Sequence, residues 1–299
     1  MIKSIEGIIE KAKSMDMKKM SVAVSQDIDV LEAIVEAKKL RITDSILVGN
    51  KEETQKIAKE NNIDIEGFEI IDIKDLNEAT NKAVQLVADG EADMVMKGLV
   101  DTSIFLKNVL IPEMNLRTGR TISGIYVCEI EGYDRLFAIT DPAINIDPDL
   151  QTKKQLIENS IQVSNALGID IPKVAVLCAK EKVNPKMPTT VDAKELEEMN
   201  KRGEIEGCVV GGPFALDNIV SVEAAKQKGI NHIVAGFADT ILAPNIETAN
   251  SLVKSITYFS RSKSAGAVVG TKKPIIITSR ADTKEDKLNT IALSALMSN

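Results

Sequence analysis

Residues 274–282, with the sequence Pro274-Ile275-Ile276-Ile277-Thr278-Ser279-Arg280-Ala281-Asp282, decide the fold class of this 299-residue chain. The β-branched run behind a proline predicts a buried strand, and the capped, amphipathic pattern from Thr283 onward predicts a helix. The segment between them is therefore a strand-to-helix turn. In open α/β sheets such turns lie at the carboxyl ends of strands, where ligands bind, and the first N–H groups of the next helix attract anions.

The hydroxyl of Ser279 and the guanidinium of Arg280 stand at this turn. Together they indicate a phosphate site, because a guanidinium binds phosphate through a bidentate fork. The alternative is that Ser279 is only a turn residue and Arg280 a solvated surface charge. The motif by itself does not decide between the two.

The rest of the chain repeats the same alternation of strand and helix. Strand-like apolar runs lie at 21–24, 45–49, 68–73, 93–98, 122–130, 135–141, 173–179, 208–210 and 232–236. Segments with helical spacing lie among them at 27–40, 51–61, 77–90, 102–110, 149–167, 191–202, 218–228 and 246–260. This order predicts an α/β fold with parallel-rich sheets covered by helices on both faces. The length exceeds that at which single cores usually stop growing, so we expect two domains.

Composition excludes several classes of function. The net charge of −7 argues against a nucleic-acid partner, so a polyanionic ligand needs a local basic pocket. Aromatic residues make up 3% of the chain, without tryptophan, which leaves few platforms for stacking bases. No stretch reaches the roughly 18 consecutive apolar residues of a membrane span. Residues 1–19 carry acidic residues within an apolar pattern and indicate a helix, not a signal peptide, so we expect a cytoplasmic protein.

Cysteine and histidine offer little chemistry. Cys128, Cys178 and Cys208 are far apart in or beside apolar runs, which indicates buried structural thiols. The single histidine, His232, heads an apolar run and is interpreted as structural, so acid-base work would fall to carboxylates.

Short motifs at the strand ends become informative when they are taken in order. They are Met96–Val100 with Thr102, Leu116–Gly119, Ile139–Asp141, Asn184–Pro188, Gly212-Pro213 with Ala215–Asp217, Val234–Gly236 with Ala238-Asp239, Pro244–Thr248 with Asn250, Ala265-Gly266 with Val269-Gly270, and Thr278–Asp282. In this order and spacing the chain resembles the phosphate acetyltransferase/phosphate butyryltransferase family over nearly its whole length. Residues 96–100 and 278–282 are similar to the butyryl branch.

The resemblance implies a two-domain fold like that of isocitrate and isopropylmalate dehydrogenases, with the active site in the cleft between domains. It places residues 1–125 with 271–299 in one domain and 126–270 in the other. It also implies a homo-oligomer, dimeric or larger. The implied reaction is reversible transfer of a short acyl group, butyryl or a branched C4–C5 chain, between coenzyme A and inorganic phosphate. The resemblance implies neither a metal nor a covalent enzyme intermediate. It implies no cofactor either, because coenzyme A is a substrate.

Four residues at the turn are the catalytic candidates. Arg280 is expected to bind the phosphoryl group, and Ser279 to donate to the carbonyl or to a phosphate oxygen. The family's acetyl branch has its catalytic acid seven residues after the serine, which implies Asp286 here. Asp286 also has the capping-box spacing from Thr283, and Asp282 is a competing base or an anchor for Arg280. The choice of base therefore stays open.

Further polar residues at loop positions are candidates for substrate binding. Those expected in the first domain are Lys97, Thr102, Lys107 and Arg117, with Arg120 beside them. Those expected in the second domain are Asp141, Asn184 and Lys186. Each lysine has the alternative interpretation of a solvated surface charge.

The chain departs from the family pattern at two places. Residues 250–254 lack a glycine and a tyrosine that the family often has, and Gly211 occupies a place where an acid is common. The competing functions are a phosphate acetyltransferase, a non-catalytic acyl-coenzyme A sensor, and a dehydrogenase with a metal held by aspartates. For the dehydrogenase, the only candidate ligands are Asp141, Asp147 and Asp149.

Overall fold

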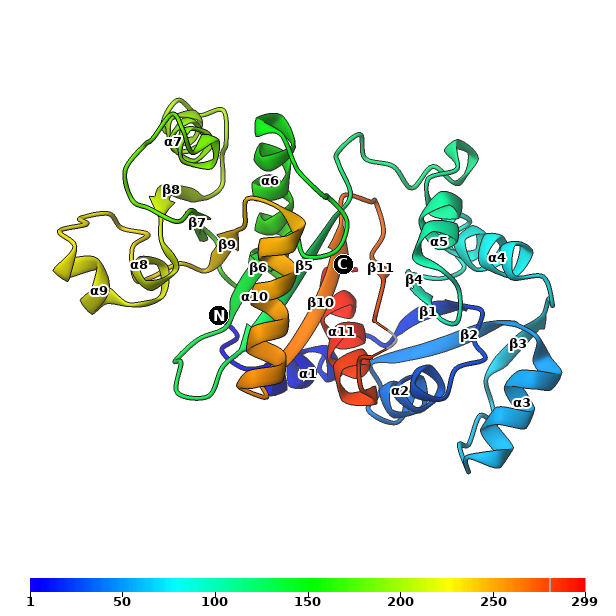
Figure 1. Cartoon of the computed structure of the whole chain (residues 1–299). Coiled ribbons are helices and arrows are strands. Elements are labelled where there is room, and N and C mark those ends of the chain that lie inside the picture. The colour runs from blue at the N-terminus through cyan, green and yellow to red at the C-terminus, as the bar shows by residue number, and fades with distance from the viewer. Residues whose placement is uncertain (280, 299) are drawn as a thin grey trace. The chain divides into compact units, whose positions relative to one another are not determined.

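The fold is taken from a computed structural model that describes residues 1–279 and 281–298. The chain forms two compact units, which we call the first unit (5–120 with 265–299) and the second unit (1–4 with 121–264). Each is an α/β unit in which helices flank a sheet (Figure 1). The domain limits implied by the resemblance, 1–125 with 271–299 and 126–270, stay a prediction.

Among the described residues, the first unit contains six strands in the order β3-β2-β1-β4-β11-β10. The strands are β1 (Lys18–Ala23), β2 (Thr43–Gly49), β3 (Glu69–Asp72), β4 (Met94–Lys97), β10 (Lys263–Val269) and β11 (Ile275–Ile276). Neighbours pair in parallel except β10, which runs antiparallel to β11. The predicted parallel-rich sheet is therefore present in this unit.

Several helices of the first unit begin at residues whose side chains cap them. They are α1 (Ile5–Lys13), α2 (Ile28–Lys39), α3 (Lys51–Glu60), α4 (Leu76–Ala88), α5 (Thr102–Val109) and α11 (Lys284–Met297), with a 3₁₀ turn at Pro112–Met114. The side chains of Asp27, Asn50 and Asp75 each accept a first-turn N–H of the helix that follows. Helix α11 packs against α1 and α2, while α4 packs against β1 and α5.

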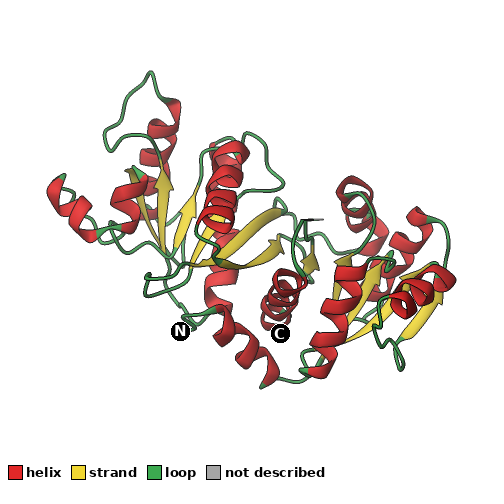
Figure 2. Ribbon diagram, turned by 60° about the horizontal axis from the view of Figure 1, so that its bottom comes forward, coloured by secondary structure: helices red, strands yellow, loops and turns green. Residues whose placement is uncertain are grey.

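The second unit contains, among its described residues, five strands in the order β5-β6-β9-β7-β8. Its strands are β5 (Ser123–Glu129), β6 (Phe137–Thr140), β7 (Lys173–Leu177), β8 (Val209–Phe214) and β9 (Thr240–Leu242). The strands β5 and β6 pair antiparallel, and the described pairs β6 with β9, β9 with β7 and β7 with β8 are parallel. The helices are α6 (Leu150–Ala166), α7 (Pro188–Lys201), α8 (Leu216–Val220), α9 (Val222–Gln227) and α10 (Ile246–Phe259), as Figure 2 shows in red.

Alternate residues of β7 enter two separate apolar cores. Ala175 and Leu177 belong to one cluster, and Val174 and Val176 to the other. Because side chains alternate across a strand, both faces of this sheet are covered. This explains why its strands appear in the sequence as continuous apolar runs.

Two sequence-based assignments in the second unit are wrong. Residues 232–236 form a turn and not a strand, and the strand at this point is β9, a few residues further along the chain. The pair Ile233-Val234 suggested a strand, but Gly236 turns the chain with φ +77°, and a Cβ there would lie 2.7 Å from Val222. The predicted helix 218–228 is two helices, because Ser221 takes an extended conformation and caps α9.

Among the described residues, no helix has both the length and the apolar character needed to cross a membrane.

Candidate functional site

The carboxyl ends of β1, β4 and β11 meet at one edge of the first unit's sheet. Ala23 pairs with Lys97, and Met96 pairs with Ile276, all in parallel. The residues that follow these three strands, Ser279 among them, therefore share that edge. Ligands of open parallel sheets bind at such edges.

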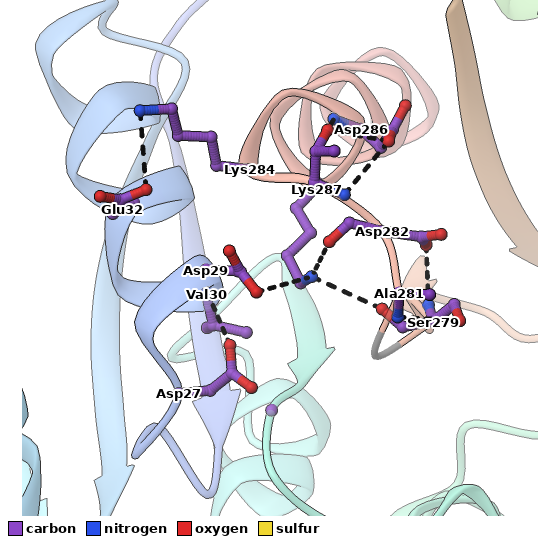
Figure 3. Close-up of polar contacts among 12 residues, drawn as sticks. Asp27, Asp29, Val30, Glu32, Ser279, Ala281, Asp282, Lys284, Asp286 and Lys287 are labelled. Atoms are coloured by element: carbon purple, nitrogen blue, oxygen red, sulfur yellow. Dashed lines mark hydrogen bonds and ion pairs between the residues drawn. The ribbon is translucent and has the colours of Figure 1, made fainter. Parts of the chain in front are cut away.

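The turn after β11 is held by its own polar groups. The Ser279 N–H donates to Asp282 Oδ2 at 2.7 Å, and the Asp282 N–H donates to the Ser279 carbonyl at 3.2 Å (Figure 3). Ser279 Oγ accepts the Ala281 N–H at 3.2 Å and remains exposed. Ser279 is thus placed as the sequence predicts, on a strand-to-helix turn. Arg280 lies outside the described residues.

Asp286 forms the capping box that its spacing predicts. Thr283 Oγ1 accepts the Asp286 N–H, while Asp286 Oδ2 accepts the Thr283 N–H at 3.2 Å and its hydroxyl at 2.8 Å. Within the part of the chain that the structure describes, these bonds to the carboxylate use Oδ2. Capping is confirmed, and a role for Asp286 as base stays a prediction.

Lys97 ends β4 and is buried, with 6% of its surface exposed. Its Nζ donates to the carbonyl oxygens of Gly98 at 3.2 Å and Val100 at 3.0 Å. The interpretation of Lys97 as a solvated surface charge is therefore wrong. Thr102, two residues after Val100, is the exposed first residue of α5, while Lys107 is exposed in the last turn of that helix.

Arg117 is exposed, and its backbone pairs with Thr271. The Thr118 hydroxyl donates to the Gly270 carbonyl at 2.6 Å beside it. Residues 270 and 271 precede β11, so this backbone lies toward the opposite end of β11 from Ser279. The structure thus groups Lys97 and Thr102 with the Ser279 turn, but not the backbone of Arg117.

Asp141 of the second unit is buried and fully engaged. Its carboxylate accepts the backbone N–H groups of Gly124, Ala143, Ile144 and Asn145 at 2.9 to 3.1 Å, besides the Asn145 side chain. Burial raises the pKa of this carboxyl, and the bonds from residues 143–145 oppose that rise. These contacts give Asp141 a structural task in its loop, and contact with substrate stays a prediction.

Asn184 and Lys186 lie in the loop before α7. Asn184 Oδ1 accepts the Lys186 N–H at 3.0 Å, and the Asn184 N–H donates to Thr190 Oγ1 at 2.8 Å. Asn184 therefore shapes the loop, while the Lys186 side chain is exposed. Their roles toward a substrate stay predictions.

Two of the three aspartates considered as metal ligands, Asp141 and Asp149, have other tasks. Asp149 caps α6 by accepting the Thr152 N–H at 2.7 Å, and Asp141 is engaged as described above. Among the described residues, no three His, Cys, Asp or Glu side chains are grouped so that they could hold a metal.

Sequence reasoning missed Lys287, whose buried side chain lies beneath the Ser279 turn (Figure 3). Its ammonium faces Asp29, in the first turn of α2, at 3.9 Å. A signal was present: Lys287 is four residues before the buried Ile291, so helical spacing places this charge on the apolar face.

Comparison with known proteins establishes the fold class first. A 4-hydroxythreonine-4-phosphate dehydrogenase from Klebsiella pneumoniae aligns with 95% of this chain and 98% of its own, with a TM-score of 0.58 at 12% identity. The likeness at this low identity concerns the fold alone, and it confirms the predicted dehydrogenase-like fold.

The family follows from a closer match. Residues 4–81 and 73–295 match the family model described as "Phosphate acetyl/butaryl transferase", and the chain belongs to this family. A phosphate butyryltransferase from Clostridium acetobutylicum is 52% identical, covering 99% of both chains, and one from Clostridium beijerinckii is 50% identical, covering 99% of this chain and 98% of its own. A branched-chain phosphotransacylase from Enterococcus faecalis has a TM-score of 0.85 at 31% identity, covering 94% of this chain and 99% of its own.

Proposed function

We propose that this protein is an acyltransferase that moves a short acyl group, butyryl or a branched C4–C5 chain, between coenzyme A and inorganic phosphate. The observation that carries this proposal is the near full-length match to phosphate butyryltransferases at 50% and 52% identity. The exposed Ser279 hydroxyl at a strand-end turn supports it, because this is where a parallel sheet presents donors to an anion.

In the direction that consumes acyl phosphate, the coenzyme A thiolate attacks the carbonyl carbon and the bond from that carbon to the phosphate oxygen breaks. The thioester forms and phosphate leaves with the bonding electron pair. Ser279 would donate to the developing oxyanion or to a phosphate oxygen, and Arg280 would bind the phosphoryl group. A placed donor of this kind contributes about 3–4 kcal/mol to the transition state. Lys97, Thr102, Lys107, Arg117, Asp141, Asn184 and Lys186 remain the proposed substrate-binding residues.

We assign the base to Asp286 and the bracing of the turn to Asp282. Asp282 Oδ2 accepts the Ser279 N–H at 2.7 Å within the turn, whereas the capping bonds of Asp286 go to Thr283 at the start of α11. A thiol with a pKa of about 8.5 is already a few per cent ionised at neutral pH, so the base contributes only about 2 kcal/mol. Asp286→Asn should therefore lose no more than about 30-fold in kcat/KM and recover as pH rises toward that pKa. Asp282→Asn should show a loss that raised pH does not restore.

The reaction is tested by following thioester absorbance after phosphate is added to acetyl-, propionyl-, butyryl- and isobutyryl-coenzyme A, with phosphate omitted as the control. We expect phosphate-dependent loss of thioester that is fastest with a C4 or branched substrate and unaffected by a chelator. Absence of thioester loss with every substrate would contradict the proposal. Activity that the chelator abolishes and magnesium restores would contradict the metal-free mechanism.

A phosphate acetyltransferase is the second candidate, because such an enzyme from Thermotoga maritima is 44% identical, covering 98% of this chain and 99% of its own. A tenfold preference for acetyl-coenzyme A in kcat/KM would select it. We further propose a cytoplasmic homo-oligomer that needs no cofactor besides its substrates. Gel filtration with light scattering would test the oligomer.

A further inference from the structure

Lys287 is a buried cation that belongs to no predicted part of the site. It lies in the first turn of α11 with 2% of its surface exposed, whereas its neighbour Lys284 is half exposed and forms an ion pair with Glu32 at 3.6 Å. Charged side chains are rarely buried to this degree unless partners compensate for the lost hydration. The partners of Lys287 therefore indicate its task.

Those partners belong to the Ser279 turn and to the start of α2. Lys287 Nζ donates to the Asp282 carbonyl at 2.5 Å and approaches the Ser279 carbonyl at 3.5 Å (Figure 3). The Asp29 carboxylate stands 3.9 Å away, and 48% of its side-chain surface is exposed. One ammonium thus links α11, the turn and α2.

The ammonium of Lys287 is compensated by the Ser279 and Asp282 carbonyl oxygens and in part by the Asp29 carboxylate. A carboxylate at 3.9 Å that is half in water is well screened and neutralises a buried ammonium only partly. The remaining positive charge lies next to the turn, where it offsets part of the negative charge of the Asp282 and Asp286 carboxylates. Because the ammonium also draws the Ser279 and Asp282 carbonyl oxygens toward itself, the partial negative charge of these oxygens is offset next to the Ser279 hydroxyl.

We propose that Lys287 is a positioning residue for the phosphate substrate, which holds the Ser279–Asp282 turn in place and supplies buried positive charge beneath it. It acts through the turn and touches neither the phosphate nor the acyl group. The inference rests on the proposed function, since it assigns phosphate to this turn.

The test is the ratio of two Michaelis constants. Lys287→Met, which keeps the length and apolar stem, should raise KM for phosphate at least about tenfold and leave KM for acyl-coenzyme A within about twofold. Lys287→Arg keeps the charge and should recover most of the phosphate affinity. Lys284→Met is the matched control on the same helical turn and should change neither constant.

A purely structural role makes a different forecast. Leu293→Ala, in the fully buried part of α11, lowers stability without touching the turn and gives the reference for such a role. If Lys287→Met matches it, with both Michaelis constants moving together or neither moving, the proposal is overturned. If Lys287→Met does not fold, Lys287→Arg decides the question. A Lys287→Arg protein that melts normally and keeps the wild-type KM for phosphate supports the role of the charge. One that melts normally and shows a tenfold higher KM for phosphate refutes it.

Binding of inorganic phosphate, measured by calorimetry without acyl-coenzyme A, separates the two proposals. Wild-type protein that binds phosphate but transfers no acyl group would contradict the proposed function and leave Lys287 testable by its effect on binding. Equal phosphate affinity in wild type and in folded Lys287→Met would refute the inference even if transfer is observed.

Discussion

Replacing Gly98 by alanine should destabilise the first unit by about 4 kcal/mol and weaken phosphate binding. Gly98 directly follows β4, beside the end of β1, and a Cβ there would lie 2.2 Å from the Val24 carbonyl oxygen and 2.8 Å from that of Ala23. Both clashing atoms belong to the backbone, so no side-chain rotation relieves them. The two strand ends must move apart.

The magnitude follows from the bonds that hold these ends together. The Gly98 N–H donates to the Ala23 carbonyl, and the Leu99 N–H to the Val24 carbonyl, each at 2.8 Å. Weakening two such bonds costs about 2 kcal/mol, and overpacking a tight contact costs a further 1–3 kcal/mol, roughly. At about 2–4 °C per kcal/mol, the melting temperature should fall by about 10 °C. Phosphate KM should rise because the Gly98 carbonyl is one of the acceptors that hold Lys97.

Differential scanning calorimetry and phosphate kinetics on two variants check this prediction. Gly90→Ala is the control, because Gly90 follows α4 with φ +79° and nothing within 4 Å of a new Cβ. Its cost is backbone strain alone, about 1–2 kcal/mol, with phosphate KM unchanged. Gly98→Ala melting no lower than Gly90→Ala would refute the steric argument.

Three further predictions concern thiols, pH and chain length. Burial raises the pKa of the Cys128 thiol to about 12 and the pKa of the Cys178 and Cys208 thiols to about 11. A thiol reagent at neutral pH should therefore label them only after unfolding, and fast labelling of the native protein would contradict this. Hydrogen bonds from Lys228 and Asn218 lower the pKa of Glu181 to about 2, so its stabilisation is complete above the usual 4.5 and is lost as pH falls toward 2. The melting-temperature difference between wild type and Glu181→Gln should accordingly shrink below about pH 4.5, and a difference that grows there would reverse the sign. An apolar acyl site discriminates by about 1–3 kcal/mol per methylene, so butyryl should exceed propionyl by about tenfold or more in kcat/KM, and equal values would exclude such a site.

The sequence predicts the strand-to-helix turns well because their signals are local. The proline and β-branched run before Ser279, and the capping pair Thr283 and Asp286, each depend on residues a few positions apart, and the structure contains both features. The alternation of strands and helices is local in the same sense. These signals were sufficient to predict the fold class and the place of the turn.

Features that depend on distant partners could not be predicted in the same way. Lys97 was open to interpretation as a surface charge: its acceptors, the Gly98 and Val100 carbonyls, are near in the sequence, but its burial comes from the packing of β4 between β1 and β11. The compensation of Lys287 by the Ser279 turn and Asp29 likewise appears only when α11 packs on α2. The prediction of a strand at 232–236 was wrong for a related reason. An apolar run indicates burial, and burial does not distinguish a packed turn from a strand.

The packing of His232 explains why residue 211 is a glycine where the family commonly has an acid. A Cβ on Gly211 would lie 2.5 Å from Cε1 of His232 and 2.9 Å from the Phe214 ring, so the two rings occupy the space that a side chain at 211 would need. His232 Nδ1 accepts the Val234 N–H at 3.2 Å, its ring lies 5.6 Å from that of Phe214, and burial lowers its pKa, which favours the neutral form. An acid at 211 and His232 in its present position therefore exclude each other. The imidazole fills the space of a side chain at 211, which supports the structural interpretation of His232.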